Sequence, residues 1–256
     1  VAVSGMTGSG TVIASIPAGG ITDVVGNTNA ASTSTDNTVT FDNTALTVTI
    51  NQAAAQADPT RNTPINFTVT FSKSVTGFAT GDVTLSGTAG ATTAIVSGGG
   101  TTYSVSVSGM TGSGTVIAAI SANVATDSSG NGNSASTSTD NTVTYDIIRP
   151  TVTINQAVGQ ADPTSFSPIY FSVVFSEPVT GFTGAGITLS GTAGATIAVV
   201  SGGGSVYNVS VSGMSGTGTV IATVNVAAAA DLANNTSFAS TSTDNTVTYD
   251  ITVPTV

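Results

Sequence analysis

The sequence predicts an all-β fold in which antiparallel β-sandwiches follow one another along the chain. Apolar and small polar residues alternate with a period of two, which is typical of strands with one buried face. Clusters of Gly, Pro and Asn interrupt the alternation about every 10 to 15 residues, as turns between strands do. Long segments also recur, and no stretch has the 3.6-residue period of an amphipathic helix.

Tandem repetition divides the chain into similar units. The segment SGMTGSGTVIA begins at Ser4 and again at Ser108, and ASTSTDNTVT begins at Ala31, Ala135 and Ala239. Each step is 104 residues, and 65 of 104 positions are identical between the two complete copies. The predicted domains are the C-terminal part of a repeat in residues 1–42, complete repeats in residues 43–146 and 147–250, and the start of another repeat in residues 251–256.

Seven strands are expected in each repeat. In the second of them, Ile65 and Phe67 share one face while Asn66 and Thr68 share the other, the pattern of a sheet buried on one side. The Gly-rich segment 97–100 joins two strands and favours a tight hairpin, because glycine adopts positive φ freely. The strands predicted for the first complete copy are 46–52, 65–72, 82–86, 92–97, 101–108, 114–120 and 141–146.

Seven antiparallel strands within about 100 residues are typical of an immunoglobulin-like β-sandwich. A parallel β-helix is the structural alternative, but its coils repeat about every 20 to 30 residues, and the shortest repeat here is 104 residues. The core Trp and the disulfide of antibody domains are absent, so aliphatic and Phe side chains must stabilise each core. We therefore expect a beads-on-a-string array of seven-stranded immunoglobulin-like sandwiches.

Composition excludes several classes of function. The chain has no Cys and no His, and its only basic residues are Arg61, Lys73 and Arg149, against thirteen acidic ones. Because thiolate and imidazole chemistry are unavailable, we expect no enzymatic activity. The net charge of −10 would repel nucleic acid, and no apolar run approaches the roughly 18 residues of a membrane helix. The expected partners are neighbouring repeats of the chain and identical chains in a fibre.

One motif carries a family resemblance. The FSEPV segment that begins at Phe175, together with the NQA, DPT, TLSGTAG and DNTVTYD segments, resembles the bacterial immunoglobulin-like repeats of large exported adhesin, biofilm or surface-fibre proteins. The likeness covers the whole chain, although the other complete copy reads FSKSV from Phe71. The resemblance implies an extracellular, cell-surface location. It also implies a spacer or stalk in adhesion, or the body of an extracellular filament or sheath, in some cases with bound calcium.

Aspartates recur at fixed positions of the repeat. The loop before the last strand keeps an Asp followed four residues later by an Asn, as in Asp127 and Asn131. Calcium takes several carboxylate, amide and carbonyl oxygens, so these two residues, with Asp146 at the linker and Asp162 from the next repeat, are expected to hold an ion that stiffens the joint. An Asx turn explains the same pattern without an ion, and this alternative stays open. The calcium candidates are Asp23, Asn27, Asp42, Asp58, Asp127, Asn131, Asp146, Asp162, Asp231, Asn235 and Asp250.

Two further features differ between the copies. Lys73 is the only lysine and its counterpart is Glu177, so we expect Lys73 at a solvated loop tip. The alternative function is a ligand-binding, lectin-like adhesin module, which needs an exposed aromatic or acidic cluster in the variable loops. Phe166 and Phe238 are the candidates for such a cluster, and neither recurs in the other complete copy.

Overall fold

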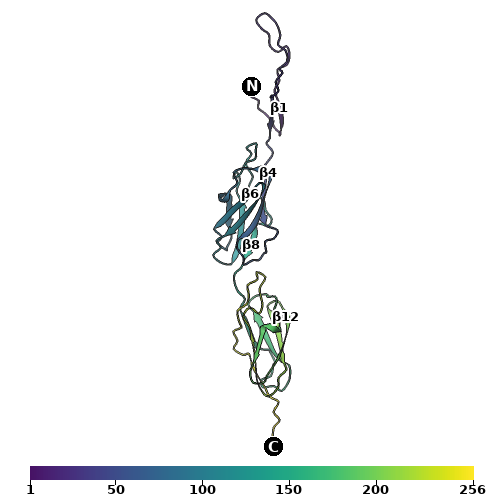
Figure 1. Cartoon of the computed structure of the whole chain (residues 1–256), viewed down its shortest axis with the longest axis vertical. Helices are drawn as coiled ribbons and strands as arrows, with labels where there is room; N and C mark the ends of the chain where they lie inside the picture. Colours follow the sequence, from purple (N-terminus) through teal and green to yellow (C-terminus); the bar gives the residue numbers. More distant parts are fainter.

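The computed structural model describes residues 1–256, and the fold is all-β, as predicted. All pairings between the strands are antiparallel. The helices are single 3₁₀ turns, η1 (Thr80–Asp82) and η2 (Gly184–Gly186), and neither has the length to cross a lipid bilayer. Figure 1 shows a long, narrow molecule in which an N-terminal ribbon (residues 1–42), a first block (residues 43–146) and a second block (residues 147–250) follow one another.

The first block contains two antiparallel sheets. One has the strand order β3-β4-β6 and the other has the order β5-β7-β8. In the first sheet, Val69 pairs with Ile50 on one side and with Tyr103 on the other. The strands are β3 (Val48–Gln52), β4 (Ile65–Val75), β5 (Val83–Ser86), β6 (Thr93–Ser108), β7 (Gly114–Ile120) and β8 (Thr142–Tyr145).

The second block has the same arrangement, except that two strands, β12 and β13, take the place of the single long strand β6. Its sheets have the orders β12-β13-β10-β9 and β11-β14-β15, so β12 and β9 are the edges of the larger sheet. The strands are β9 (Val152–Gln156), β10 (Ile169–Phe175), β11 (Ile187–Ser190), β12 (Ile197–Gly203), β13 (Val206–Ser212), β14 (Gly218–Val224) and β15 (Thr246–Tyr249).

The two sheets of each block enclose one apolar core, which gives a sandwich-like arrangement. The first core contains 20 buried residues between Leu46 and Tyr145, and the second contains 18 between Val152 and Val247. Strand β4 follows the predicted alternation, because Ile65 and Phe67 are fully buried while Asn66 between them is half-buried. Burying one such side chain contributes about 1.5–3 kcal/mol, so these faces are the main source of stability.

An aromatic trio closes the same end of both cores. The rings of Phe71, Phe78 and Tyr103 meet edge to face with centroids 5.1 to 5.8 Å apart. Phe175, Phe182 and Tyr207 repeat the arrangement in the second block. The hydroxyl of Tyr207 donates to the carbonyl of Val179 at 2.9 Å, which satisfies the one polar atom of the trio. The aromatic part of the two cores is therefore equivalent.

The Gly-rich segment is a hairpin in both blocks, as predicted. In the second block it joins β12 to β13, and Gly202 and Gly204 have φ of 109° and 66°. In the first block both arms belong to the single element β6, and a Cβ on Gly98 would lie 2.7 Å from the carbonyl oxygen of Thr102. A side chain at this position would collide with the opposite arm, so glycine is needed for the turn.

The N-terminal ribbon contains only two paired strands, β1 (Gly10–Ile13) and β2 (Thr38–Phe41). None of its residues is buried. Val39 is 68% exposed, whereas its counterparts Val143 and Val247 are fully buried in the two cores. The same local sequence thus forms the same strand with or without an opposing sheet, and only the opposing sheet buries it.

Candidate functional site

The Asp-x-x-x-Asn loop forms the same turn in each repeat. In the first block, Oδ1 of Asp127 accepts the backbone N–H of Asn131 at 3.0 Å, and Oδ2 accepts the Asn131 side-chain amide at 3.0 Å. Asp231 and Asn235 make both bonds in the second block, at 2.8 and 2.9 Å. These bonds are the Asx-type turn of the alternative explanation, and they preorganise the loop. Asp23 and Asn27 make the same pair of bonds in the ribbon.

The turn of each block binds the end of the unit before it. The side-chain amide of Asn131 donates to the carbonyl of Asp42 at 3.0 Å, and that of Asn235 donates to the carbonyl of Asp146 at 2.9 Å. The prediction that Asp127 works together with Asp146 is therefore wrong. The turn lies at the N-terminal end of its own block, so it meets the last residue of the unit before it. We call the contacts around Asp42 the first junction and those around Asp146 the second junction.

The first junction is closed by a lysine between two aspartates. The ammonium of Lys73 lies 2.8 Å from Oδ2 of Asp42 and 2.9 Å from Oδ2 of Asp127, and it donates to the carbonyl of Thr44. The Lys73 side chain is only 26% exposed, so the prediction of a solvated loop tip is wrong. The reason is that strand β4 continues to Val75, two residues past Lys73, so Lys73 lies within a strand rather than in a loop.

We call Asp42, Lys73 and Asp127 the ammonium triad. The ammonium and the two carboxylates stabilise each other's charged forms. Hydrogen bonding to Lys73 holds the pKa of Asp42 well below its usual range, and hydrogen bonds from Asn131 and then Lys73 lower the pKa of Asp127 to about 2. The same contacts raise the pKa of Lys73. All three groups are therefore ionised at neutral pH, and the junction carries a cation supplied by the chain itself.

The second junction has the same positions but no cation. Glu177 stands where Lys73 stands in the first block. One carboxylate oxygen from each of Asp146, Glu177 and Asp231 lies within 4.8 Å of the other two. Asp231 is only 4% exposed. Burial, followed by the charges of Asp231 and Asp146, raises the pKa of Glu177. We call this group the carboxylate triad; like charges at this spacing repel unless a cation or a proton lies among them.

The carboxylate triad fits a calcium ion in its ligand type and spacing. Calcium binds oxygen ligands at about 2.3–2.6 Å, so oxygens around one ion lie no more than about 5 Å apart. The three carboxylates would supply part of a shell of six to eight oxygens. Glu177 is the residue that the sequence analysis missed. Its signal was the exchange of Lys for Glu at a repeat position flanked by two recurring aspartates.

Other contacts fix the second junction. The guanidinium of Arg61, in the first block, donates to the carbonyl of Asn234 in the second at 3.0 Å. Arg149 donates to the carbonyls of Thr236 and Ser237 at 2.7 and 2.9 Å, and its guanidinium carbon lies 4.2 Å from the ring centre of Phe238. Phe238 is therefore a partner of Arg149 rather than a free aromatic side chain.

The remaining acidic candidates cap strands and turns. Asp58 accepts the backbone N–H of Thr144, and Asp162 accepts that of Thr248, both at 2.9 Å, so each holds the last strand of its own block. Neither belongs to the carboxylate triad. Asp250 accepts the N–H of Thr252 and the hydroxyl of Thr217, which lowers its pKa. It thus repeats the local turn made by Asp42 and Asp146.

No protein-family model matches the chain, and no curated protein matches its sequence.

Proposed function

We propose that the chain is a structural repeat segment of a long extracellular surface protein, built from tandem immunoglobulin-like sandwiches. It acts as a spacer or stalk in adhesion, or as the body of an extracellular filament or sheath. The observation that carries the proposal is the second junction, where the bonds from Asn235 and Arg61 join the two blocks directly. Blocks joined in this way hold a fixed direction, which is what a spacer needs.

The immunoglobulin-like description rests on strand number and pairing. Each block has seven antiparallel arms when the hairpin within β6 is counted as two, and the arms form two sheets over one core. This number and this layering are typical of immunoglobulin-like domains of about 100 residues. The resemblance of the FSEPV segment to bacterial surface repeats supports the same proposal.

An extracellular location agrees with the composition. The chain has only three basic residues and no Cys, and its polar surface consists mainly of Thr, Ser and Asn. Such a surface offers few sites to trypsin-like proteases and has no thiol to oxidise. A role outside the cell is therefore the one this composition suits best.

Calcium at the second junction is part of the proposal. The carboxylate triad brings three negative charges together, and the first junction holds an ammonium at the corresponding place. A divalent cation would take the role that Lys73 has in the first block, and Asp146 and Asp231 would bind it from the two sides of the block boundary. The ion would then resist bending between the blocks.

The spacer role is tested by the distance between the blocks in solution. Because the chain has no Cys, spin labels can be placed at Ser86→Cys and Ser190→Cys, two exposed equivalent positions. Pulsed electron–electron double resonance should give one narrow distribution of the distance between the two labels when calcium is present. Asn235→Ala should broaden it. A broad distribution in the labelled parent chain would contradict a spacer.

The choice between stalk and filament is tested by assembly. The purified chain is followed by light scattering and electron microscopy as its concentration is raised. A monomer at all concentrations supports the stalk, whereas ordered fibres support the filament body. Irregular aggregates from a folded chain contradict both roles.

A further inference from the structure

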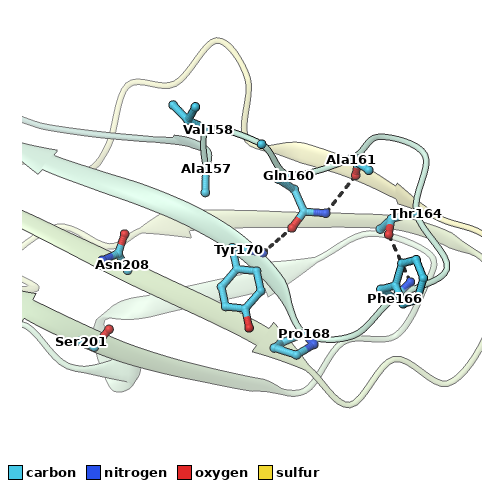
Figure 2. A pocket seen from close by; sticks show the side chains of 11 residues that line it. Ala157, Val158, Gln160, Ala161, Thr164, Phe166, Pro168, Tyr170, Ser201 and Asn208 are labelled. Carbon is cyan, nitrogen blue, oxygen red and sulfur yellow. Dashed lines mark hydrogen bonds between the residues drawn. The ribbon is translucent and has the colours of Figure 1, made fainter.

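The second block carries a pocket on the outer face of its larger sheet. The pocket has a volume of about 580 Å³ and lies between the loop after β9 and the strands β10, β12 and β13. Figure 2 shows the Tyr170 ring in its centre, with Pro168 beside the ring and Gln160 above it. Ser201 and Asn208 project from the neighbouring strands. A pocket of this volume is in the range of small-molecule sites.

The backbone around the pocket is held identically in both blocks. Oε1 of Gln160 accepts the N–H of Tyr170 at 2.9 Å, and the hydroxyl of Thr164 accepts the N–H of Phe166 at 3.1 Å. The same bonds in the first block, at 2.8 and 3.1 Å, join Gln56 to Asn66 and Thr60 to Asn62. The loop therefore folds in the same way whether aromatic or amide side chains stand at the two variable positions.

Two side chains beside the pocket are aromatic only in the second block. Phe166 replaces Asn62 and is 79% exposed, and Tyr170 replaces Asn66 and is 48% exposed. Because the first block folds with Asn at both positions, neither ring is required by the framework. Two exposed aromatic rings beside one pocket cost solvation free energy and mark an interaction site.

The same face carries two further apolar replacements. Val174 and Val206 replace Thr70 and Thr102 and pair across β10 and β13, and they are 44% and 52% exposed. The buried face of the same strands keeps its residues, as at Phe171 and its counterpart Phe67. On these two strands, divergence between the copies has thus altered outward positions and kept the buried ones.

The lining of the pocket fits a neutral carbohydrate. None of its 11 residues is charged, and the chain's net charge of −10 disfavours an anion. The C–H groups of a sugar ring carry partial positive charge and pack on the negative face of an aromatic ring. The amide of Asn208 and the hydroxyls of Ser201 and Tyr170 can pair with sugar hydroxyls, whereas a purely apolar ligand would leave them unpaired.

We propose that this pocket binds a neutral glycan chain, with Tyr170 and Phe166 as stacking platforms and Asn208 as the hydrogen-bonding partner. The second block would then be a point of attachment within an otherwise structural chain. This role goes beyond the spacer function and depends on neither calcium nor the junctions.

The test uses the whole chain on an array of neutral and acidic glycans, followed by titration with the neutral oligosaccharide that binds best. Binding is measured by calorimetry and by tyrosine fluorescence, since the chain has no Trp. We expect binding to neutral glycans. Tyr170→Asn should weaken it about tenfold and Phe166→Asn about threefold or more, since each ring supplies a stacking contact.

The first block supplies matched controls. Tyr170→Asn and Phe166→Asn each introduce the residue that the first block has at the equivalent position. Their melting curves should therefore match that of the parent chain. Val174→Thr, on the same face but not in the pocket lining, should leave binding unchanged. The triple change Asn62→Phe, Asn66→Tyr and Ser104→Asn should create a second binding site and raise the stoichiometry from one to two.

Three results would overturn the proposal: no neutral glycan bound at millimolar concentration, binding of acidic glycans only, or binding that survives the double change of Tyr170 and Phe166 to Asn.

Discussion

The first and second blocks share 65 of 104 residues and equivalent cores, yet their N-terminal ends carry opposite charge chemistry. At the first junction, Lys73 lies between two aspartates. At the second junction, Glu177 lies beside the aspartates at the two equivalent positions. A single position thus separates a junction that supplies its own cation from one that needs an external cation or a proton. The comparison teaches that a repeat can keep its fold while the chemistry of its junction changes.

The largest expected effect concerns what the two blocks share. Phe71→Ala in the first block and Phe175→Ala in the second remove the same buried ring from the same aromatic trio. Each should destabilise its own block by about 3–5 kcal/mol. Calorimetry would show one transition moving in each variant, which assigns the transitions. Unequal losses would mean that the cores differ more than their contacts indicate.

The next largest expected effect is a difference between the two blocks in how much calcium stabilises them. If the carboxylate triad binds the ion only when folded, free calcium at 100 times the dissociation constant stabilises the second block by about 2.7 kcal/mol. The first block supplies only Asp146 to the triad, so its transition should move less. The measurement is a pair of melting curves in calcium and in chelator. Equal shifts of both transitions would locate calcium elsewhere, and no shift would remove it from the proposal.

Exchanging the junction charges should exchange this behaviour. Glu177→Lys places an ammonium between Asp146 and Asp231, so the second block should melt higher in chelator and lose its response to calcium. Lys73→Glu should lower the melting temperature of the first block in chelator and make it respond to calcium. Glu177→Gln is the control, because it removes one charge without supplying a cation. An unchanged calcium response in Glu177→Lys would contradict the site.

The two Asn side chains that cross the junctions should have similar effects. Asn131→Ala and Asn235→Ala each remove the bond to the preceding unit and the bond to the Asp of their own turn. Each change should cost about 1–3 kcal/mol, because a buried acceptor loses its partner. Denaturant unfolding of the assigned transitions measures it. A loss confined to one block would show that the two turns are not equivalent.

The smallest effect is a pH dependence of opposite kind in the two blocks. The folded-state pKa of Glu177 is raised above 4.5, so its charge opposes folding at neutral pH, and stability in chelator should rise as pH falls through that pKa. The pKa values of Asp42 and Asp127 are lowered, so their contribution holds above pH 3.8 and is lost only below it. Melting curves in chelator between pH 7 and about 4.5 should therefore move only the second transition.

The sequence by itself determined the strands, the buried faces and the repeat frame. Ile65 and Phe67 alternate with polar residues, and this period of two is a local property that any strand with one buried face shows. The need for glycine in the hairpin is also a local property, because the positive φ values depend on the turn alone. The ends of the strands are not determined so closely by the sequence. The first predicted strand begins at Leu46, whereas β3 begins at Val48.

Only the tertiary structure decided which side chains meet. Asp127 pairs with Lys73, which also holds Asp42 at the end of the ribbon. It does not meet Asp146 in this way, because the end of a block at which a loop lies is set by the packing of the whole sandwich. The pocket gathers Phe166, Tyr170 and Asn208 from a loop and two strands for the same reason. Periodicity records which face a residue occupies, whereas the distances between residues far apart in sequence depend on how the sheets pack.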